Sequence, residues 1–401
     1  MKNKLISISA VVLVLALVLT LVASCGKEKG EVLTLKIGLV APLSGPAAAW
    51  GVQYETGTKF AVADFNAAGG IKVGKDTYMM EVVTCDDKMT GSVAGTCATE
   101  MAYDQKVKYV CGPIGAVVEA MLPTFDENKI IQISCTGDVY CDYPYSFVVG
   151  GPPNWSPNFY REFHRLHPEV KTVAIITSED PNSHIFYDNT VPVIAELGME
   201  LLETEWFTLG ITDFYPILTK LLAHNPDALE TGWSGPGDQA LIMKQARELG
   251  FTGWFLTWAY VPVELLEPMV GLDYMYKMAT AMPVFTSEYY SPQMRELARR
   301  YMEEGWSQPG ETSMPDVVVH GYSCVSQIVT AIEEAGTIDP EEVLKVMDDP
   351  DFTFERYYVP NATIGGVETF GCRRFVPHFV PYGEIIDGEL VQMGGAACLV
   401  P

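Results

Sequence analysis

Aromatic residues in the connecting loops are the side chains of this sequence with the clearest capacity for chemistry. Rings that face a cleft can stack on a flat ligand or surround a quaternary ammonium group. Four of the seven tryptophans and one tyrosine lie in or beside predicted loops, where a core position is less expected: Trp50, Trp155, Trp233, Trp258 and Tyr260. Asp138 would add negative charge to such a cage. The alternative is that two or more of these tryptophans pack a hinge between parts of the protein instead of contacting a ligand.

Small residues in the same loops would let the backbone approach a ligand closely. Glycine has no side chain, so its N–H group can contact a bound molecule directly. Four loop glycines fit this role: Gly115, Gly137, Gly232 and Gly235. Backbone N–H groups hold carboxylates as they hold other anions at helix N-termini. The loops therefore predict a binding site for a small organic molecule.

Signatures of catalysis are missing from the sequence. No GxGxxG follows the first predicted strand, no P-loop or HExxH occurs, and residues 232–235 lack the spacing of a nucleophile elbow. The histidines are scattered without metal-ligand spacing. His184 falls in a predicted cleft loop and is a candidate ligand contact, whereas His320 opens a helix and is expected to be structural. Asp86 and Asp87 end a strand and are expected to cap the next turn. We predict a protein that is not an enzyme and has neither a metal nor a cofactor.

Alternating strands and helices position these loops. Predicted strands at 33–40, 78–85, 107–111 and 130–135 are separated by helical segments at 52–68, 91–105 and 117–128. The rhythm breaks at Gly150-Gly151-Pro152-Pro153 and restarts with strands at 172–177, 199–207, 228–231 and 254–257. This pattern predicts an α/β fold with two doubly wound parallel-sheet lobes. The candidate residues follow the carboxyl ends of the strands, where ligands bind in such sheets.

Length and charge narrow the class of protein. The 401 residues exceed what one hydrophobic core usually accommodates, which agrees with two lobes. A net charge of −25 argues against nucleic acid and against anionic lipid headgroups as partners. The acidity would attract a cationic or zwitterionic ligand, although a solvated acidic surface is the simpler interpretation.

The first 25 residues resemble the export signal of a bacterial lipoprotein. Two lysines precede an apolar stretch from Leu5 to Leu21, and Val22-Ala23-Ser24-Cys25 follows. This predicts a signal peptide over 1–24, a diacylglyceryl group on Cys25 and a tether over 25–32. The mature protein would be lipid-anchored outside the cytoplasm, and Gly26 favours an outer membrane in a two-membrane host. A plain N-terminal membrane anchor is the alternative.

Eight cysteines follow Cys25, an even number that permits disulfides in an exported protein. Cys372 and Cys398 are close enough in sequence to form a bridge. Five more cysteines crowd one segment and could supply two further bridges: Cys85, Cys97, Cys111, Cys135 and Cys141. A host that lives without oxygen could instead leave all of them as buried thiols.

Six ordered motifs resemble those of the leucine/isoleucine/valine-binding type of periplasmic receptor. They are APLSGPAAAWG (41–51), FNAAGGI (65–71), CDD (85–87), YVCGP (109–113), KQARELG (244–250) and GYSCVSQIVTAIEEAG (321–336). The resemblance implies three crossings between the lobes, hinge closure on a ligand and delivery to an ABC permease in the inner membrane. We expect 33–149 and 283–340 in the N-terminal lobe, 150–282 and 341–401 in the C-terminal lobe, and a monomer.

Departures from the family pattern bear on the ligand. Amino-acid receptors usually have a hydroxyl residue after the GP of the third strand, where this chain has Ile114-Gly115-Ala116. Thr136-Gly137-Asp138 places an acid where the α-carboxylate is usually held, and Trp258-Ala259-Tyr260 lacks the acid that would hold an ammonium. Trp50 occupies the family's aromatic position. We therefore expect a small organic carboxylate, amino-acid derivative or aromatic acid. A branched-chain amino acid binder and a sensor domain with a signalling partner are the alternatives.

Overall fold

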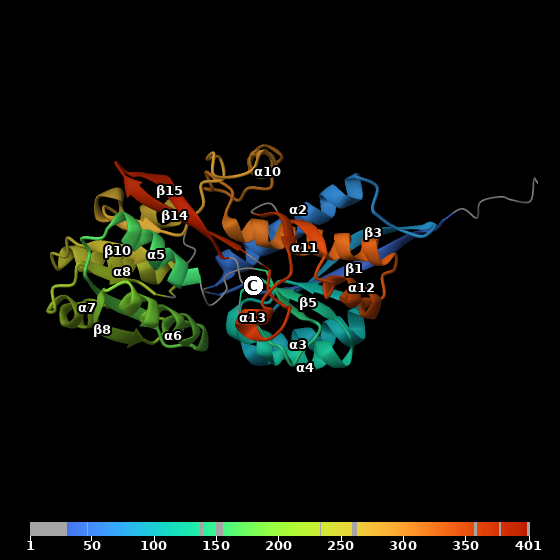
Figure 1. Cartoon of the computed structure of the whole chain (residues 1–401), viewed down its shortest axis with the longest axis horizontal. Helices are drawn as coiled ribbons and strands as arrows, with labels where there is room; N and C mark the ends of the chain where they lie inside the picture. Colours follow the sequence, from blue (N-terminus) through green and yellow to red (C-terminus); the bar gives the residue numbers. More distant parts are fainter. Residues whose placement is uncertain are drawn as a thin grey trace, which may run out of the picture.

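The computed structural model describes residues 30–45, 47–136, 139–149, 155–232, 234–258, 263–356, 359–376 and 378–398. Residues Cys25, Gly137, Asp138, Trp233 and Tyr260 lie outside these ranges. The described residues form two lobes that lie side by side along the longest axis of the molecule (Figure 1). No helix in these ranges has the length and apolar character that crossing a bilayer requires.

A six-stranded sheet forms the centre of the first lobe, in the order β2-β3-β1-β4-β5-β6. Strand β1 pairs in parallel with β3 and β4, and only β2 is antiparallel to its neighbour. The second half of β1 reads as a continuous apolar run because both faces of this sheet are covered by helices. The strands are β1 (Val32–Ala41), β2 (Ile71–Val73), β3 (Asp76–Asp86), β4 (Tyr109–Cys111), β5 (Ile131–Ser134) and β6 (Ser146–Val148).

A seven-stranded mixed sheet forms the second lobe, in the order β15-β14-β11-β10-β9-β7-β8. Its first five strands in sequence are parallel, and β14 and β15 add an antiparallel pair at one edge. The strands are β7 (Thr172–Ser178), β8 (Glu200–Phe207), β9 (Ala228–Glu230), β10 (Trp254–Thr257), β11 (Met278–Thr280), β14 (His378–Ile386) and β15 (Glu389–Cys398). The predicted α/β fold with two lobes is confirmed.

Helices cover both sheets. In the first lobe they are α2 (Ala48–Ala67), α3 (Gly91–Thr99), the π-helix η1 (Glu100–Gln105), the 3-10 helix η2 (Gly115–Ala120), α4 (Leu122–Glu127), α10 (Pro292–Glu303), α11 (Asp316–Ala335) and α12 (Pro340–Met347). In the second lobe they are α5 (Trp155–Leu166), α6 (Pro181–Glu196), α7 (Tyr215–Leu222), α8 (Pro236–Glu248), α9 (Val263–Val270) and the 3-10 helix η3 (Leu272–Tyr274).

Helices α2 and α11 pack with unusually close backbones. A Cβ atom at Gly57 would lie 1.9 Å from the carbonyl oxygen of Val318, and one at Gly321 would lie 2.4 Å from that of Tyr54. Only glycine fits at either position, because no backbone atom can move aside without separating the helices. This contact fixes the start of α2 relative to the start of α11.

The segment after α11 differs from its predicted placement in the second lobe. Val343 and Met347 of α12 are fully buried in the first-lobe core, and so are Phe354 and Val376 further along the chain. The predicted boundary at residue 340 is therefore wrong, since α12, β12 (Thr353–Arg356) and β13 (Val359–Thr363) place apolar side chains in the first core. Phe370 of α13 (Val367–Phe370) packs against Val148 and Phe375 in a small separate cluster. The chain leaves that lobe only after Val376, and β14 and β15 then join the second sheet (Figure 1).

Three crossings join the lobes, as predicted. The first and third leave the first lobe side by side, since Val148 pairs with Phe375 and its N–H donates to the carbonyl oxygen of Arg374 at 2.9 Å. The second crossing follows β11, where the N–H of Val284 donates to Oε1 of Gln392 at 3.0 Å. These crossings are the segments that a hinge motion would bend.

Three disulfides lie in the first lobe: Cys85–Cys97, Cys111–Cys324 and Cys141–Cys372. The predicted bridge between Cys372 and Cys398 is wrong, because folding brings Cys372 beside the loop after β5, where Cys141 lies. The interpretation that all the cysteines are thiols is wrong as well. The buried Cys135 lies with its sulfur 3.4 Å from Nδ1 of His320.

Candidate ligand-binding site

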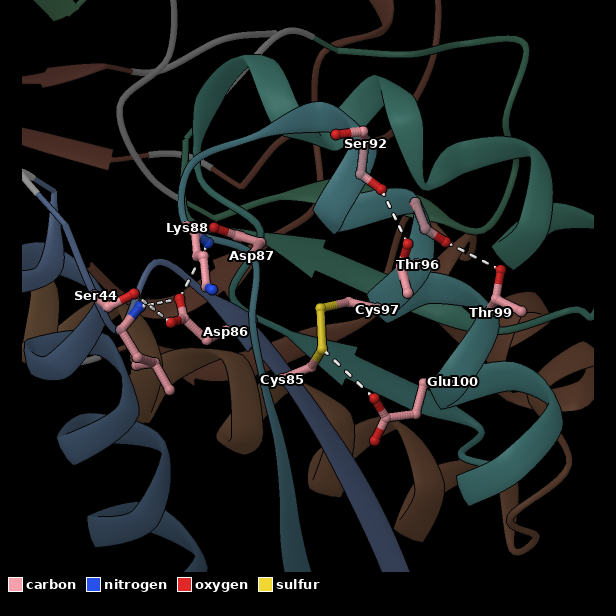
Figure 2. Close-up of a disulfide and its surroundings, with 12 residues drawn as sticks. Ser44, Cys85, Asp86, Asp87, Lys88, Ser92, Thr96, Cys97, Thr99 and Glu100 are labelled. Carbon is pink, nitrogen blue, oxygen red and sulfur yellow. Dashed lines mark hydrogen bonds between the residues drawn. A yellow bond between two sulfur atoms is a disulfide. The ribbon is translucent and has the colours of Figure 1, made fainter.

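Asp86 holds the loop that follows β1 at the edge of the first lobe. Its carboxylate accepts hydrogen bonds from the N–H of Leu43 at 2.8 Å and from the hydroxyl of Ser44 at 2.6 Å (Figure 2). Burial alone would raise the pKa of Asp86, but these hydrogen bonds and that from the Lys88 N–H outweigh it and lower the pKa. Asp86 therefore acts as an anchor for the loop rather than as one half of a catalytic pair.

Asp87 points to the turn before α3. The Met89 N–H donates to it at 2.8 Å, and the side chain is fully buried. Burial raises the pKa of Asp87 to about 6, with a further rise from the Asp86 charge and an opposing effect of the Met89 hydrogen bond. The disulfide between Cys85 and Cys97 ties this end of β3 to α3 (Figure 2). The end of β3 is thus connected to the loop after β1 by the Asp86 hydrogen bonds and to α3 by the disulfide.

The ends of β4 and β5 bring Gly115 and Thr136 together. The Gly115 N–H donates to the carbonyl oxygen of Thr136 at 3.1 Å, and Ile114 forms an isolated bridge with Thr136. Thr136 is buried, and Ala116 lies in the first turn of η2. Trp50 lies in the first turn of α2, is half-buried and packs against the first-lobe core. These residues share the same edge of the sheet.

Trp155 and Trp258 lie inside the second lobe. Each is 2% exposed, and the indole N–H of Trp155 donates to the carbonyl oxygen of Trp258 at 3.0 Å. The structure gives both rings the packing role that was the alternative interpretation of the sequence, because their N–H groups find partners within the lobe. They line a core at the base of the crossing rather than an open loop.

Glu230 is the acid that organises this cluster. The indole N–H of Trp258 donates to its Oε1 at 2.7 Å, and the Tyr160 hydroxyl donates to its Oε2. Burial raises the pKa of Glu230 to about 7, although both hydrogen bonds lower it. Sequence reasoning missed this residue. Its signal was an acid at the end of an apolar strand, directly before a predicted cleft loop.

His184 is separate from the other candidates. It lies in the first turn of α6 rather than in a loop, stacks on Trp206 with ring centroids 4.2 Å apart and is 2.9 Å from a carboxylate oxygen of Glu179. About half of its side chain is exposed. Its position in the loop was predicted wrongly, because Asp180 caps α6 four residues earlier and starts the helix there.

A cavity of about 520 Å³ lies where the two lobes meet. Helix α2 supplies Ala49, Val52 and Gln53, and the loop before α11 supplies residues 308–311. Pro268 of α9 and Met282 of the second crossing complete the wall from the other side. Of the singled-out residues that the structure describes, none lines this cavity, although Trp50 lies between two lining residues of α2. The loop at 308–311 follows a helix rather than a strand, so the strand-end rule could not find it.

This chain is similar in sequence and in fold to known binding proteins. The family model described as periplasmic binding protein matches residues 34–369. A Leu/Ile/Val-binding protein homologue of Brucella suis is 24% identical over 319 residues, which cover 78% of this chain and 82% of that protein. A leucine-binding protein of Thermotoga maritima has a TM-score of 0.75 at 20% identity and covers 90% of this chain and 98% of its own.

A further solved structure is a solute-binding protein of an ABC transporter from Rhodopseudomonas palustris, in complex with 3,4-dihydroxybenzoic acid. Its TM-score is 0.74 at 20% identity, with 91% of this chain and 98% of that chain covered. At this level of identity the structural similarities establish the fold.

Proposed function

Since this chain belongs to the periplasmic binding protein family, whose members are non-enzymatic receptors outside the cytoplasm, we propose that it is the solute-binding receptor of an ATP-driven importer. The observation that carries the proposal is the cavity of about 520 Å³ with walls from both lobes. A small molecule that touches both walls stabilises the closed state over the open one, and so couples binding to hinge closure. An ABC permease would recognise that closed state.

The proposed ligand is a small organic carboxylate, an amino-acid derivative or an aromatic acid. Trp50 would offer a ring, while Gly115, Ala116 and Thr136 would offer backbone groups at the strand ends. Gly137, Asp138, Trp233 and Tyr260 belong to the same proposal through their positions in the sequence. The known relatives include a leucine-binding protein and one in complex with an aromatic acid, so the fold accommodates both classes.

The proposed anchor is a lipid on Cys25, with a monomeric receptor tethered near its permease. Confinement to the membrane surface would raise the effective concentration of the receptor at the transporter. Mass spectrometry of protein purified from membranes should show Cys25 as the acylated N-terminus. A C25S variant whose residues 1–24 are replaced by a signal that is cleaved independently of Cys25 should be released into the soluble fraction. Retention of that variant at the membrane would contradict the lipid anchor.

A thermal-shift screen against amino acids, aromatic acids and quaternary amines tests the proposed function. We expect at least one compound to raise the melting temperature, and small-angle scattering should then show a more compact molecule. A strong shift with leucine, isoleucine or valine alone would overturn the preferred ligand class. Absence of any shift across the screen would count against the receptor function itself.

Trp50→Ala should weaken binding of the compound that the screen identifies by about tenfold, the value typical of a lost aromatic contact in a binding site. Trp254→Ala is the matched control, because Trp254 is half-buried in the second lobe and packs against Phe163 and His167. It should lower stability and leave affinity unchanged. Equal affinity of the Trp50 variant and the natural protein would place Trp50 in the scaffold.

A further inference from the structure

Glu311 is a carboxylate in the wall of this cavity. Its Oε2 accepts hydrogen bonds from the Tyr301 hydroxyl and from the N–H of Gln308, the latter at 2.8 Å. The amide of Gln53 approaches its Oε1 at 3.5 Å, the limit of a hydrogen bond. Within the described ranges, Glu311 forms no ion pair. One oxygen is therefore well held and the other retains most of its capacity to accept.

Tyr301 fixes the orientation of this carboxylate. The Tyr301 side chain is fully buried, and burial together with the hydrogen bond to Glu311 raises its pKa well above the usual range. The phenol therefore stays protonated and acts only as a donor towards Glu311. Because a rigid, buried ring holds Oε2, the carboxyl group cannot swing into solvent at a low cost. It remains at the cavity in the absence of ligand.

The other lining residues of the cavity are neutral. Alanine, valine, methionine and three prolines provide apolar walls, and two glutamines and a serine provide the remaining polar groups. None of the lining residues that the structure describes is a lysine, arginine or histidine. A partly desolvated carboxylate with no counter-charge is unfavourable, and a bound cation would relieve this cost. A ligand with only a carboxylate would instead meet a like charge.

We propose that Glu311 is a specificity-determining residue that binds a protonated amine of the ligand while the apolar walls take its body. This rests on the proposed function, in which a ligand occupies the cavity between the lobes. Through this contact, Glu311 would make the receptor bind amino-acid derivatives more tightly than simple carboxylates and aromatic acids. The carboxylate of such a zwitterion would have to be held elsewhere, by backbone groups such as those at the strand ends.

Two series of compounds with a common body test the assignment. Phenylalanine, phenethylamine and 3-phenylpropionate share an aromatic body, and leucine, 3-methylbutylamine and 4-methylpentanoate share an aliphatic one. Isothermal titration with the whole mature protein should show that the two amine-bearing members of at least one series bind at least tenfold more tightly than the acid. Glu311→Gln should weaken amine binding at least tenfold and leave the acid unchanged, whereas Glu311→Asp should restore part of the loss.

Glu303→Gln is the matched control, since Glu303 is exposed on α10 and pairs with Arg299. It should leave all affinities unchanged. If Glu311→Gln does not fold, the salt dependence of amine binding by the natural protein provides a second readout, because a charge contact weakens as salt rises. Amine binding that does not change between low and high salt would contradict the assignment.

The inference is overturned if an acid binds as tightly as its amine counterpart, or if Glu311→Gln leaves amine affinity within twofold. It is also overturned if neither series binds and a plain carboxylate from the wider screen does. In these cases the receptor function stands, because the protein still binds a small molecule. If no compound in the screen binds, the proposed function fails and the inference fails with it.

Discussion

Glu230 shows how one residue can join several segments of the second lobe. Its two carboxyl oxygens accept hydrogen bonds from Tyr160 of α5 and from Trp258, which follows β10. Trp155 then ties the start of α5 to the backbone of Trp258. A single buried acid thus links the middle of α5 to the ends of β9 and β10, which lie next to the predicted ligand loops. A substitution that removes the carboxyl group of Glu230 should therefore loosen the packing of α5, β9 and β10 together.

Stability should fall as the pH rises through the titration range of Glu230. Burial raises the pKa of Glu230 to about 7 from 4.5, so the folded state binds more protons than the unfolded state between these values. The free energy of unfolding should therefore decrease between pH 5 and pH 8, by about 2–3 kcal/mol from this group. Urea unfolding at several pH values should show that the free energy of unfolding decreases less between pH 5 and pH 8 for Glu230→Gln than for the natural protein.

Glu296→Gln is a suitable control for that experiment, because Glu296 is exposed on α10 and pairs with Arg299, which stays charged over this pH range. The comparison between variants removes the contribution of Asp87, which is common to all three proteins. Parallel pH profiles for the natural protein and Glu230→Gln would show that Glu230 is ionised throughout, contrary to this interpretation.

At the scale of elements, the close approach of α2 and α11 aligns the two helices whose first turns border the cavity. Gly57→Ala should destabilise the protein by about 2 kcal/mol or more, because the new Cβ would overlap the backbone of Val318 and push the helices apart. Gly95→Ala is the matched control in α3, where the nearest atom lies at an ordinary contact distance of 3.5 Å.

The control should be neutral or stabilising by about 0.5 kcal/mol, since alanine is the better helix former. Both variants can be compared by urea unfolding, and ligand affinity should fall only for Gly57→Ala, whose helix borders the cavity. Equal stability of the two variants would mean that α2 and α11 can separate without cost.

The elements were largely predictable, and the residues of the cavity were not. Strand-helix alternation is a local signal, so the parallel strands of both sheets and the ends of β4 and β5 could be predicted from periodicity alone. The placement of α12 depends on which core its apolar face meets, and the roles of Trp155 and Trp258 depend on partners up to a hundred residues away. Glu311 lacks any local motif, because its position in the cavity arises only when α10, α11 and α2 pack together.

At the scale of the whole molecule, the two lobes are stabilised differently. All three disulfides among the described residues are in the first lobe, and Cys141–Cys372 ties the loop after β5 to the segment before the third crossing. The first lobe is therefore a cross-linked platform from which two of the three crossings leave together. The second lobe depends on its hydrophobic cores and on the Glu230 network.

Reduction should loosen one lobe selectively. Under dithiothreitol, hydrogen exchange should rise in β4 and α11, which the bridge between Cys111 and Cys324 connects, and remain nearly constant in β7 and β9. Removal of that bridge as the double variant C111S/C324S should cost about 2–5 kcal/mol, the range for closing a long loop. A uniform rise in exchange across both lobes would show that the lobes unfold as one unit.

The spacing of the paired cysteines also constrains how the chain acquires its structure during export. Cys85 and Cys97 are 12 residues apart, whereas the other two pairs are separated by 213 and 231 residues, with most of the second lobe between them. A chain that emerges N-terminus first can therefore form the short bridge at once, while Cys111 and Cys141 wait until nearly the whole protein has crossed the membrane. During that interval Cys111, Cys135 and Cys141 are all available as thiols in one stretch of chain, so we expect an envelope that can reshuffle disulfides to raise the yield of the correctly bridged protein.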